Sequence, residues 1–226
     1  MMRTILFPLI LGVGGVAVLL WLGFWQLDRL AWKQAVLADI DARLMAAPVP
    51  VAAGMTEAGD EYRAVVLSGV PTGEELHVLV SGTAAGTGYR VISGFETDSG
   101  LQVMLDQGLL PLEGKAAAPL VAPMQVEGTL LWPDDRNSST PDPDVAGNIW
   151  FARDVGPMAE VLGTAPLMVV ARQVSPPDPR LTVLPVDSAT IKNDHWEYAV
   201  TWFLLAAVWG AMTLYFIYRA TRREGA

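Results

Sequence analysis

The sequence predicts a membrane protein of the α+β class: two transmembrane helices, N- and C-terminal, flank a periplasmic, mainly antiparallel β domain with a short helix. Two charge-free apolar runs, at residues 5–25 and 200–217, support the helices. Each run is about as long as a helix needs to cross a bilayer core. Between them lie short segments rich in β-branched residues, separated by turn residues, which predict strands.

We divide the 226 residues into five parts on this basis. They are a first transmembrane helix at 1–25, a helical extension at 26–47, a β-rich domain at 48–192, a second transmembrane helix at 193–218 and a basic tail at 219–226.

Basic residues near the two runs predict the topology. Arg219, Arg222 and Arg223 follow the second run, and Arg3 precedes the first. Because Lys and Arg mark the cytoplasmic side of a span, both termini are expected in the cytoplasm. The main domain then lies outside, which in a bacterium is the periplasm, and the protein is a multi-pass protein of the inner membrane in contact with lipid.

The first run has two possible interpretations, a cleavable signal peptide or a permanent anchor. A signal peptide has a shorter apolar core and a cleavage site flanked by small residues. Here the run is full length and ends in Trp21-Leu22-Gly23-Phe24-Trp25. The sequence therefore favours an uncleaved anchor.

The first helix is expected to continue beyond the membrane. Leucine and isoleucine residues recur at helical spacing on one face, namely Leu27, Leu30, Leu37, Ile40 and Leu44. Pro48 and Pro50 then end the helix. A helix from residue 5 to residue 46 would be about 60 Å long, because each residue adds about 1.5 Å.

Seven segments of the central domain have strand-like composition, and one has the signature of a short helix. The strands are expected at 63–68, 76–81, 89–95, 101–106, 125–131, 148–153 and 167–174. The helix is expected at 157–162, where Pro157 suits its first turn and Gly163 suits its end. This order of elements indicates a small antiparallel sheet or an open barrel.

Composition excludes several kinds of site. The chain has no cysteine and two histidines, so disulfides, thiolate sites and multi-histidine metal cages are excluded. Residues 34–194 contain nine Lys or Arg and 21 Asp or Glu, a net charge of −12. Such an acidic domain lacks the basic surface that nucleic acids require, so no nucleic acid partner is expected. No Ser/His/Asp set or nucleotide-binding glycine loop is evident, and His77 is expected to be a half-exposed strand residue.

An aromatic and basic stripe marks the outer end of the first span. Trp21, Trp25, Arg29 and Trp32 follow one helical face, and Lys33 lies four residues after Arg29. One interpretation is an interfacial belt whose cations meet lipid phosphates. The alternative is that the cations bind the carboxylates of a ligand.

The second span begins with a corresponding stripe. His195, Tyr198 and Trp202 lead into two pairs of small residues. The pairs Ala206/Gly210 and Ala207/Ala211 allow close helix packing, so the two spans are expected to pack through this face.

The two stripes would then bring a histidine, tryptophans and two cations together at the outer leaflet. Such a set suits a haem, with His195 for the iron, Trp25, Trp32, Tyr198 and Trp202 as walls, and Arg29 and Lys33 for the propionates. The alternative is that His195 is an ordinary interfacial residue.

Several segments resemble the Surfeit locus protein one family. The sequence at 23–33, Gly-Phe-Trp-Gln-Leu-Asp-Arg-Leu-Ala-Trp-Lys, is similar to the signature that closes the family's first span. The sequence at 193–203, Asn-Asp-His-Trp-Glu-Tyr-Ala-Val-Thr-Trp-Phe, is similar to the signature that opens its last span. Residues 150–154 and 89–91 also resemble family segments. Residues 106–111 depart from the family, which often has Asn-Arg-Gly-Trp-Val-Pro where this chain has Asp-Gln-Gly-Leu-Leu-Pro.

The resemblance implies an assembly factor, not an enzyme, for a haem–copper terminal oxidase such as cytochrome c oxidase of the respiratory chain. It implies binding of haem a with His195 as the metal ligand, and partnership with the oxidase catalytic subunit and other assembly factors. Two alternatives stay open. One is a haem-free scaffold that stabilises the catalytic subunit, and the other is a membrane-anchored enzyme with a polar pocket in the β domain.

Overall fold

The computed structural model describes residues 2–83 and 85–224, and it divides into two compact units. The helical unit comprises Met1–Asp39 and Ser188–Ala226, and the β unit comprises Ile40–Asp187. Each unit has its own packing and is described by itself.

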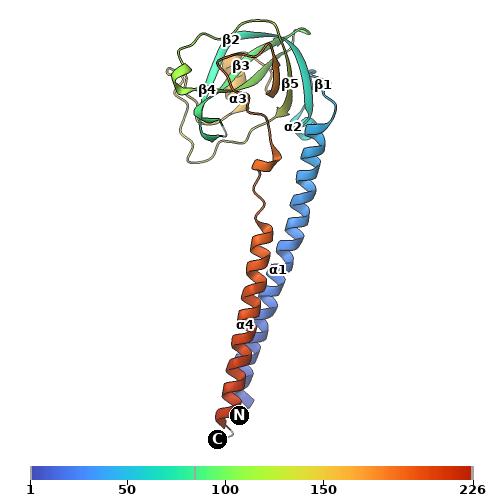
Figure 1. The fold of residues 1–226 in the computed structure, drawn as a ribbon, viewed down its shortest axis with the longest axis vertical. Helices are drawn as coiled ribbons and strands as arrows, with labels where there is room; N and C mark the ends of the chain where they lie inside the picture. The colour runs from blue at the N-terminus through green and yellow to red at the C-terminus, as the bar shows by residue number, and fades with distance from the viewer. Residues whose placement is uncertain (1, 84, 225–226) are drawn as a thin grey trace. The chain divides into compact units, whose positions relative to one another are not determined.

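Two long helices form the helical unit. Helix α1 (Met2–Met45) has 44 residues and continues from the helical unit into the β unit, while α4 (His195–Glu224) has 30 residues. Both are long and apolar enough to cross a membrane, over Leu6–Met45 and His195–Arg222. One helix therefore covers both the first apolar run and the extension that its leucine spacing predicted. In Figure 1 the two helices run side by side in opposite directions.

Glycines of α1 bring the two helices into close contact. At three of them an added Cβ atom would collide with a side chain of α4, so only glycine allows the observed approach. The contacts are Gly12 against Thr213, Gly15 against Trp209 and Gly23 against Phe203. The expected packing of the two helices is therefore confirmed.

One of the two small-residue pairs in α4 lies in this contact. Ala206 is buried, with 4% of its surface exposed, and a Cβ at Gly210 would lie 3.6 Å from Val16. Ala207 and Ala211 are exposed, so the expectation that this second pair helps to pack the helices is wrong. One residue further along a helix is rotated by about 100°, which places these alanines outside the contact.

Six strands form one sheet in the β unit. They are β1 (Val49–Pro50), β2 (Ala64–Thr83), β3 (Gly86–Thr97), β4 (Gln102–Pro111), β5 (Met124–Leu131) and β6 (Met168–Ser175). The order is β1-β2-β3-β4-β6-β5, and β5 also pairs with β2. This last pairing closes strands β2 to β6 into a barrel, and Figure 1 shows them curving around a common centre.

The barrel corrects the expectation of a small antiparallel sheet or open barrel in two respects. It is closed, and β1–β2 and β4–β6 are parallel pairs within an otherwise antiparallel arrangement. Closure depends on the length of β2, which has 20 residues. Its first part pairs with β5, its second part pairs with β3, and Gly69 takes part in both pairings. The strands expected at 63–68 and 76–81 are thus one bent strand.

Four short helices lie in the segments that connect these elements. They are α2 (Glu57–Asp60), η1 (Leu112–Gly114), α3 (Val155–Leu162) and η2 (Ser188–Thr190). Helix α3 was expected at 157–162, and it ends at Gly163 in the left-handed conformation. The strand expected at 148–153 forms only single bridges, including Trp150 with Val78, because Asn148 has a positive φ of 47° that interrupts an extended backbone.

Two apolar clusters fill the β unit. The first lies inside the barrel and includes the fully buried Phe95, Val103 and Leu130. The second packs α3 against the sheet through Met158, which contacts a cluster containing Ile92. Gly108 in β4 has a φ of 115°, and a Cβ there would collide with the carbonyl oxygen of Thr182, so this position requires glycine.

The segment that departs from the family pattern holds a buried carboxylate. Asp106 is fully buried, accepts a hydrogen bond from Arg90 at 2.5 Å, and lies 3.6 Å from Arg153. Burial raises the pKa of Asp106, although both arginines act to lower it. The two cations neutralise a carboxylate that would otherwise be unpaired in the barrel.

A second group of buried charges links the segment that follows β6 with strand β2. Arg180 donates to Glu75 at 2.8 Å and to Asp178 at 2.6 Å. Burial acts to raise the pKa of Glu75, but the interactions with His77 and Arg180 outweigh it and hold that pKa below its ordinary value of 4.5. The ionised form of Glu75 therefore stabilises the fold.

Helix packing predicts opposite results for two neighbouring glycines. We expect Gly15→Leu to separate the helices, because a side chain there collides with Trp209, and Gly14→Leu to be tolerated, because nothing lies within 4 Å of its Cβ position. The measurement is disulfide formation between Val16→Cys and Gly210→Cys, in a chain that has no other cysteine. Equal cross-linking in the Gly14→Leu and Gly15→Leu backgrounds would contradict this packing.

The Glu75 network predicts acid sensitivity of the β unit. Because the folded-state pKa of Glu75 is below 4.5, its contribution is present above about pH 4.5 and is lost as the pH falls through the folded-state value. We expect Glu75→Gln to cost about 1–3 kcal/mol of unfolding free energy at pH 7 and less at acidic pH. Glu74→Gln, at the exposed neighbouring residue, is the matched control. Thermal unfolding of the full chain as a function of pH measures both, and a pH-independent effect of Glu75→Gln would refute the assignment.

Candidate functional site

His195 is the first residue of α4 and is half-buried in the helical unit. Its Nδ1 atom lies 2.8 Å from Oε1 of Gln26 on α1, within hydrogen-bond distance. Asp194 precedes the helix, and its carbonyl accepts a bond from the Tyr198 amide. The imidazole is therefore held between the two helices by a polar partner.

Sequence reasoning did not identify Gln26 as a site residue. It is 9% exposed, and the small or apolar positions that face α4 precede it along the helix. The signal was present, because Gln26 is the only residue between positions 5 and 27 whose side chain carries an amide, a hydroxyl or a charge. A lone polar side chain at the end of a candidate membrane span is a functional candidate.

Polar atoms without partners lie around the beginning of α4. The indole Nε1 of Trp202 and the Oδ1 of Asn193 are buried, and neither has a hydrogen-bond partner in the described chain. The Nε2 atom of His195 likewise has no hydrogen bond to any described residue. A buried donor or acceptor without a partner costs about 1–3 kcal/mol, so a ligand that satisfied Trp202 Nε1 or Asn193 Oδ1 would gain that free energy.

The other predicted aromatic residues lie on the outside of the helices. Trp25 is 48% exposed, Trp32 49% and Tyr198 56%. The structure thus brings His195 and Trp202 onto the face shared by the two helices, and it leaves the other three rings available to lipid or to a bound molecule. Trp25 directly precedes Gln26, so it lies at nearly the same height along α1 as the contact with His195.

The two predicted cations are adjacent to this level. Arg29 stacks on the Trp32 ring, with its guanidinium carbon 3.8 Å from the ring centroid, and Lys33 is half-buried one turn further along α1. Neither cation forms an ion pair with a carboxylate of the described residues. Both charges are available to an anionic group.

The described residues contain no group of three or more metal-ligating side chains. A bare metal ion would therefore find at most partial coordination. A haem would need fewer protein ligands, because its macrocycle already supplies four nitrogens to the iron and one imidazole would hold it. The free Nε2 of His195 and the unpartnered Nε1 of Trp202 fit such a group.

His77 is less suited to bind a ligand. It was expected to be half-exposed, but it is 7% exposed because the backbone at Trp150 pairs with its carbonyl oxygen and covers the strand. Both of its ring nitrogens lack hydrogen bonds within the described residues. The nearest carboxylate is Glu75 at 3.7 Å, and Arg180 already holds that group.

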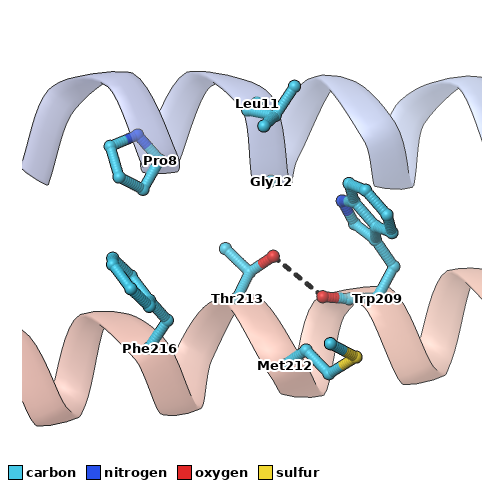
Figure 2. Close-up of a pocket in the computed structure, with 7 residues that line it drawn as sticks. All are labelled: Pro8, Leu11, Gly12, Trp209, Met212, Thr213 and Phe216. Carbon is cyan, nitrogen blue, oxygen red and sulfur yellow. Dashed lines mark hydrogen bonds between the residues drawn. The ribbon is translucent and has the colours of Figure 1, made fainter.

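Figure 2 shows a groove between the two helices that is lined by residues including Pro8, Trp209 and Phe216. It lies far from His195 along the helix axis. Its lining is almost wholly apolar, and the hydroxyl of Thr213 already donates to the carbonyl of Trp209. Trp209 is 14 residues beyond His195, which corresponds to about 21 Å of helix. Its lining includes the Trp209 indole but no histidine, carboxylate or cation, so the groove is a weaker candidate than the His195 end.

A pocket in the β unit lies where β1 ends beside β2, and its polar lining includes Ser68, Thr97 and Ser99. The lining also includes Asp98, but its carboxylate forms no hydrogen bond with a hydroxyl of this pocket in the described chain. The Thr97 hydroxyl lies 2.9 Å from that of Ser99 and already donates to the Leu101 carbonyl. This lining does not form the set of nucleophile and base that acyl or phosphoryl transfer requires.

Comparison with known proteins gives a consistent family. A model of the SURF1 family matches residues 13–207. The chain is 26% identical to Surfeit locus protein 1 of Rattus norvegicus over 211 residues, which covers 82% of this chain and 68% of the rat protein. It is 28% identical to Surfeit locus protein 1 of Takifugu rubripes over 209 residues, covering 82% and 87%. It is 29% identical to a SURF1-like protein of Rickettsia bellii over 217 residues, covering 92% and 87%. The chain therefore belongs to the SURF1 family.

Proposed function

We propose that this protein is an assembly factor for a haem–copper terminal oxidase, which binds haem a at the outer membrane interface and aids its insertion into the catalytic subunit. Family membership supports the general role. The observation that carries the haem part is the half-buried His195, whose Nδ1 is held by Gln26 and whose Nε2 has no described partner.

Each residue of the site has a separate role in this proposal. A bound haem supplies an iron that accepts an imidazole nitrogen. His195 Nε2 would be that ligand, and the Trp202 indole N–H would donate to a polar group of the haem. Trp25, Trp32 and Tyr198 would cover its apolar surface, while Arg29 and Lys33 would pair with its carboxylates.

The proposed topology places both termini in the cytoplasm and the β unit in the periplasm of a bacterium. Arg219 and Arg222 at the end of α4 support this orientation through the positive-inside rule. Membrane lipid then surrounds both spans, and His195 lies at the periplasmic surface. The partners are the oxidase catalytic subunit and other assembly factors.

A haem-free scaffold is the second candidate. It is favoured by small residues on the outer faces of the helices: Gly14 has nothing within 4 Å of its Cβ position, and Ala207 and Ala211 are exposed. Small residues allow another transmembrane helix to approach closely. In this case the protein binds the catalytic subunit while another factor supplies haem.

Haem content of the purified protein tests the proposal. We expect protein from cells that make haem a to carry it, and His195→Ala to reduce the haem content at least about 10-fold, because the iron loses its ligand. His77→Gln, at the only other histidine, should leave the content unchanged once folding is verified. Pigment extraction and absorption spectra measure this.

A colourless wild-type protein, or unchanged haem in His195→Ala, would refute haem binding at this site. Co-purification of the oxidase subunit with the colourless protein would instead support the scaffold.

A further inference from the structure

The contact between Gln26 and His195 determines which imidazole nitrogen carries hydrogen. Oε1 of Gln26 lies 2.8 Å from Nδ1 of His195. An amide oxygen can only accept a hydrogen bond, so this contact requires hydrogen on Nδ1. In a neutral ring the lone pair then lies on Nε2, the nitrogen without a described partner. If the amide were reversed, its NH₂ group would donate to Nδ1 and hydrogen would occupy Nε2, where it would block metal binding.

The surrounding helix contact holds the two side chains in place. Gly23, one turn before Gln26, packs directly against Phe203, and Ala199, one turn after His195, is 1% exposed. These small residues keep the helices close enough for a glutamine to reach across. His195 is the first residue of α4, so the preceding turn of a helix does not constrain its ring, and Gln26 is the only described side chain hydrogen-bonded to it.

We propose that Gln26 is a positioning residue that fixes His195 in the Nδ1–H tautomer and directs Nε2 toward an incoming iron. The tautomer assignment stands on the helix contact alone, whereas the iron part rests on the proposed function. Ligand histidines commonly donate their second N–H to a carboxylate or carbonyl, which fixes ring orientation and strengthens the metal bond. Here a side-chain amide on the neighbouring helix provides that acceptor.

A purely structural role would also place a polar pair between two membrane helices, where such bonds stabilise packing by about 1 kcal/mol. The two roles differ in what a substitution changes. Either role fixes the imidazole tautomer through the same hydrogen bond, but only a positioning role also changes how tightly Nε2 binds iron. Gln26→Leu removes the acceptor, Gln26→Glu retains one, and Gln34→Leu at an exposed position of α1 is the matched control.

The first measurement is ¹⁵N NMR of the full chain without haem in nanodiscs, in a His77→Gln background so that His195 is the only histidine. Spectra are compared at a pH where the ring is neutral. We expect hydrogen on Nδ1 in the wild type, in Gln26→Glu and in Gln34→Leu, and a shift toward Nε2–H in Gln26→Leu. Hydrogen on Nε2 in the wild type, or an unchanged tautomer in Gln26→Leu, would overturn the proposal.

The second measurement is haem affinity, followed by the absorption spectrum of the bound form. We expect Gln26→Leu to weaken binding about 10- to 100-fold, and Gln26→Glu and Gln34→Leu to bind within a few-fold of the wild type. If the tautomer shifts but the wild type binds no haem, the proposed function fails and the role of Gln26 in fixing the tautomer stands. If the wild type binds haem through His195 and Gln26→Leu binds equally well, the positioning role toward iron is refuted while the proposed function stands.

Discussion

The close contact between α1 and α4 is the constraint on which the candidate site depends. Glycines at positions 12, 15 and 23 leave no side chain between the helices, so α4 can approach within reach of a glutamine on α1. The apolar contact therefore brings the helices close enough for one hydrogen bond, between Gln26 and His195, to form at its end. That bond orders a histidine which would otherwise rotate freely at the start of a helix.

The β unit and the helical unit differ in how their polar groups are used. In the barrel, Asp106 is neutralised by Arg90 and Arg153, and Arg180 joins Glu75 to Asp178. These charges are committed to each other and stabilise the fold. Around the start of α4, in contrast, a histidine nitrogen and an indole N–H have no described partner.

Local patterns predicted the elements, but not the contacts that join distant parts of the chain. The apolar runs, the leucine spacing of residues 27–44 and the proline and glycine around α3 are local signals, and these elements were found. Closure of the barrel was missed because it depends on pairing between β2 and β5, which are far apart in sequence. Gln26 was missed although its place as a lone polar residue in an apolar run is a local signal, whereas its pairing with His195, 169 residues away, is a long-range contact that no local pattern shows.

The departure of residues 106–111 from the family pattern bears on where function resides. Where the family often has arginine and tryptophan, this chain has Gln107 and Leu109, and both are buried in the barrel wall. Gln107 donates to Ser93 at 2.8 Å, so it completes an internal hydrogen bond. Gly108, shared with the family pattern, is required by its positive φ and by the approach of Thr182. The segment thus keeps the backbone feature that shapes the strand, and its changed side chains serve internal contacts: Asp106 pairs with Arg90 and Arg153, Gln107 bonds to Ser93 and Leu109 packs. Such internal contacts are what a structural role for the barrel wall predicts if ligand chemistry belongs to the helices.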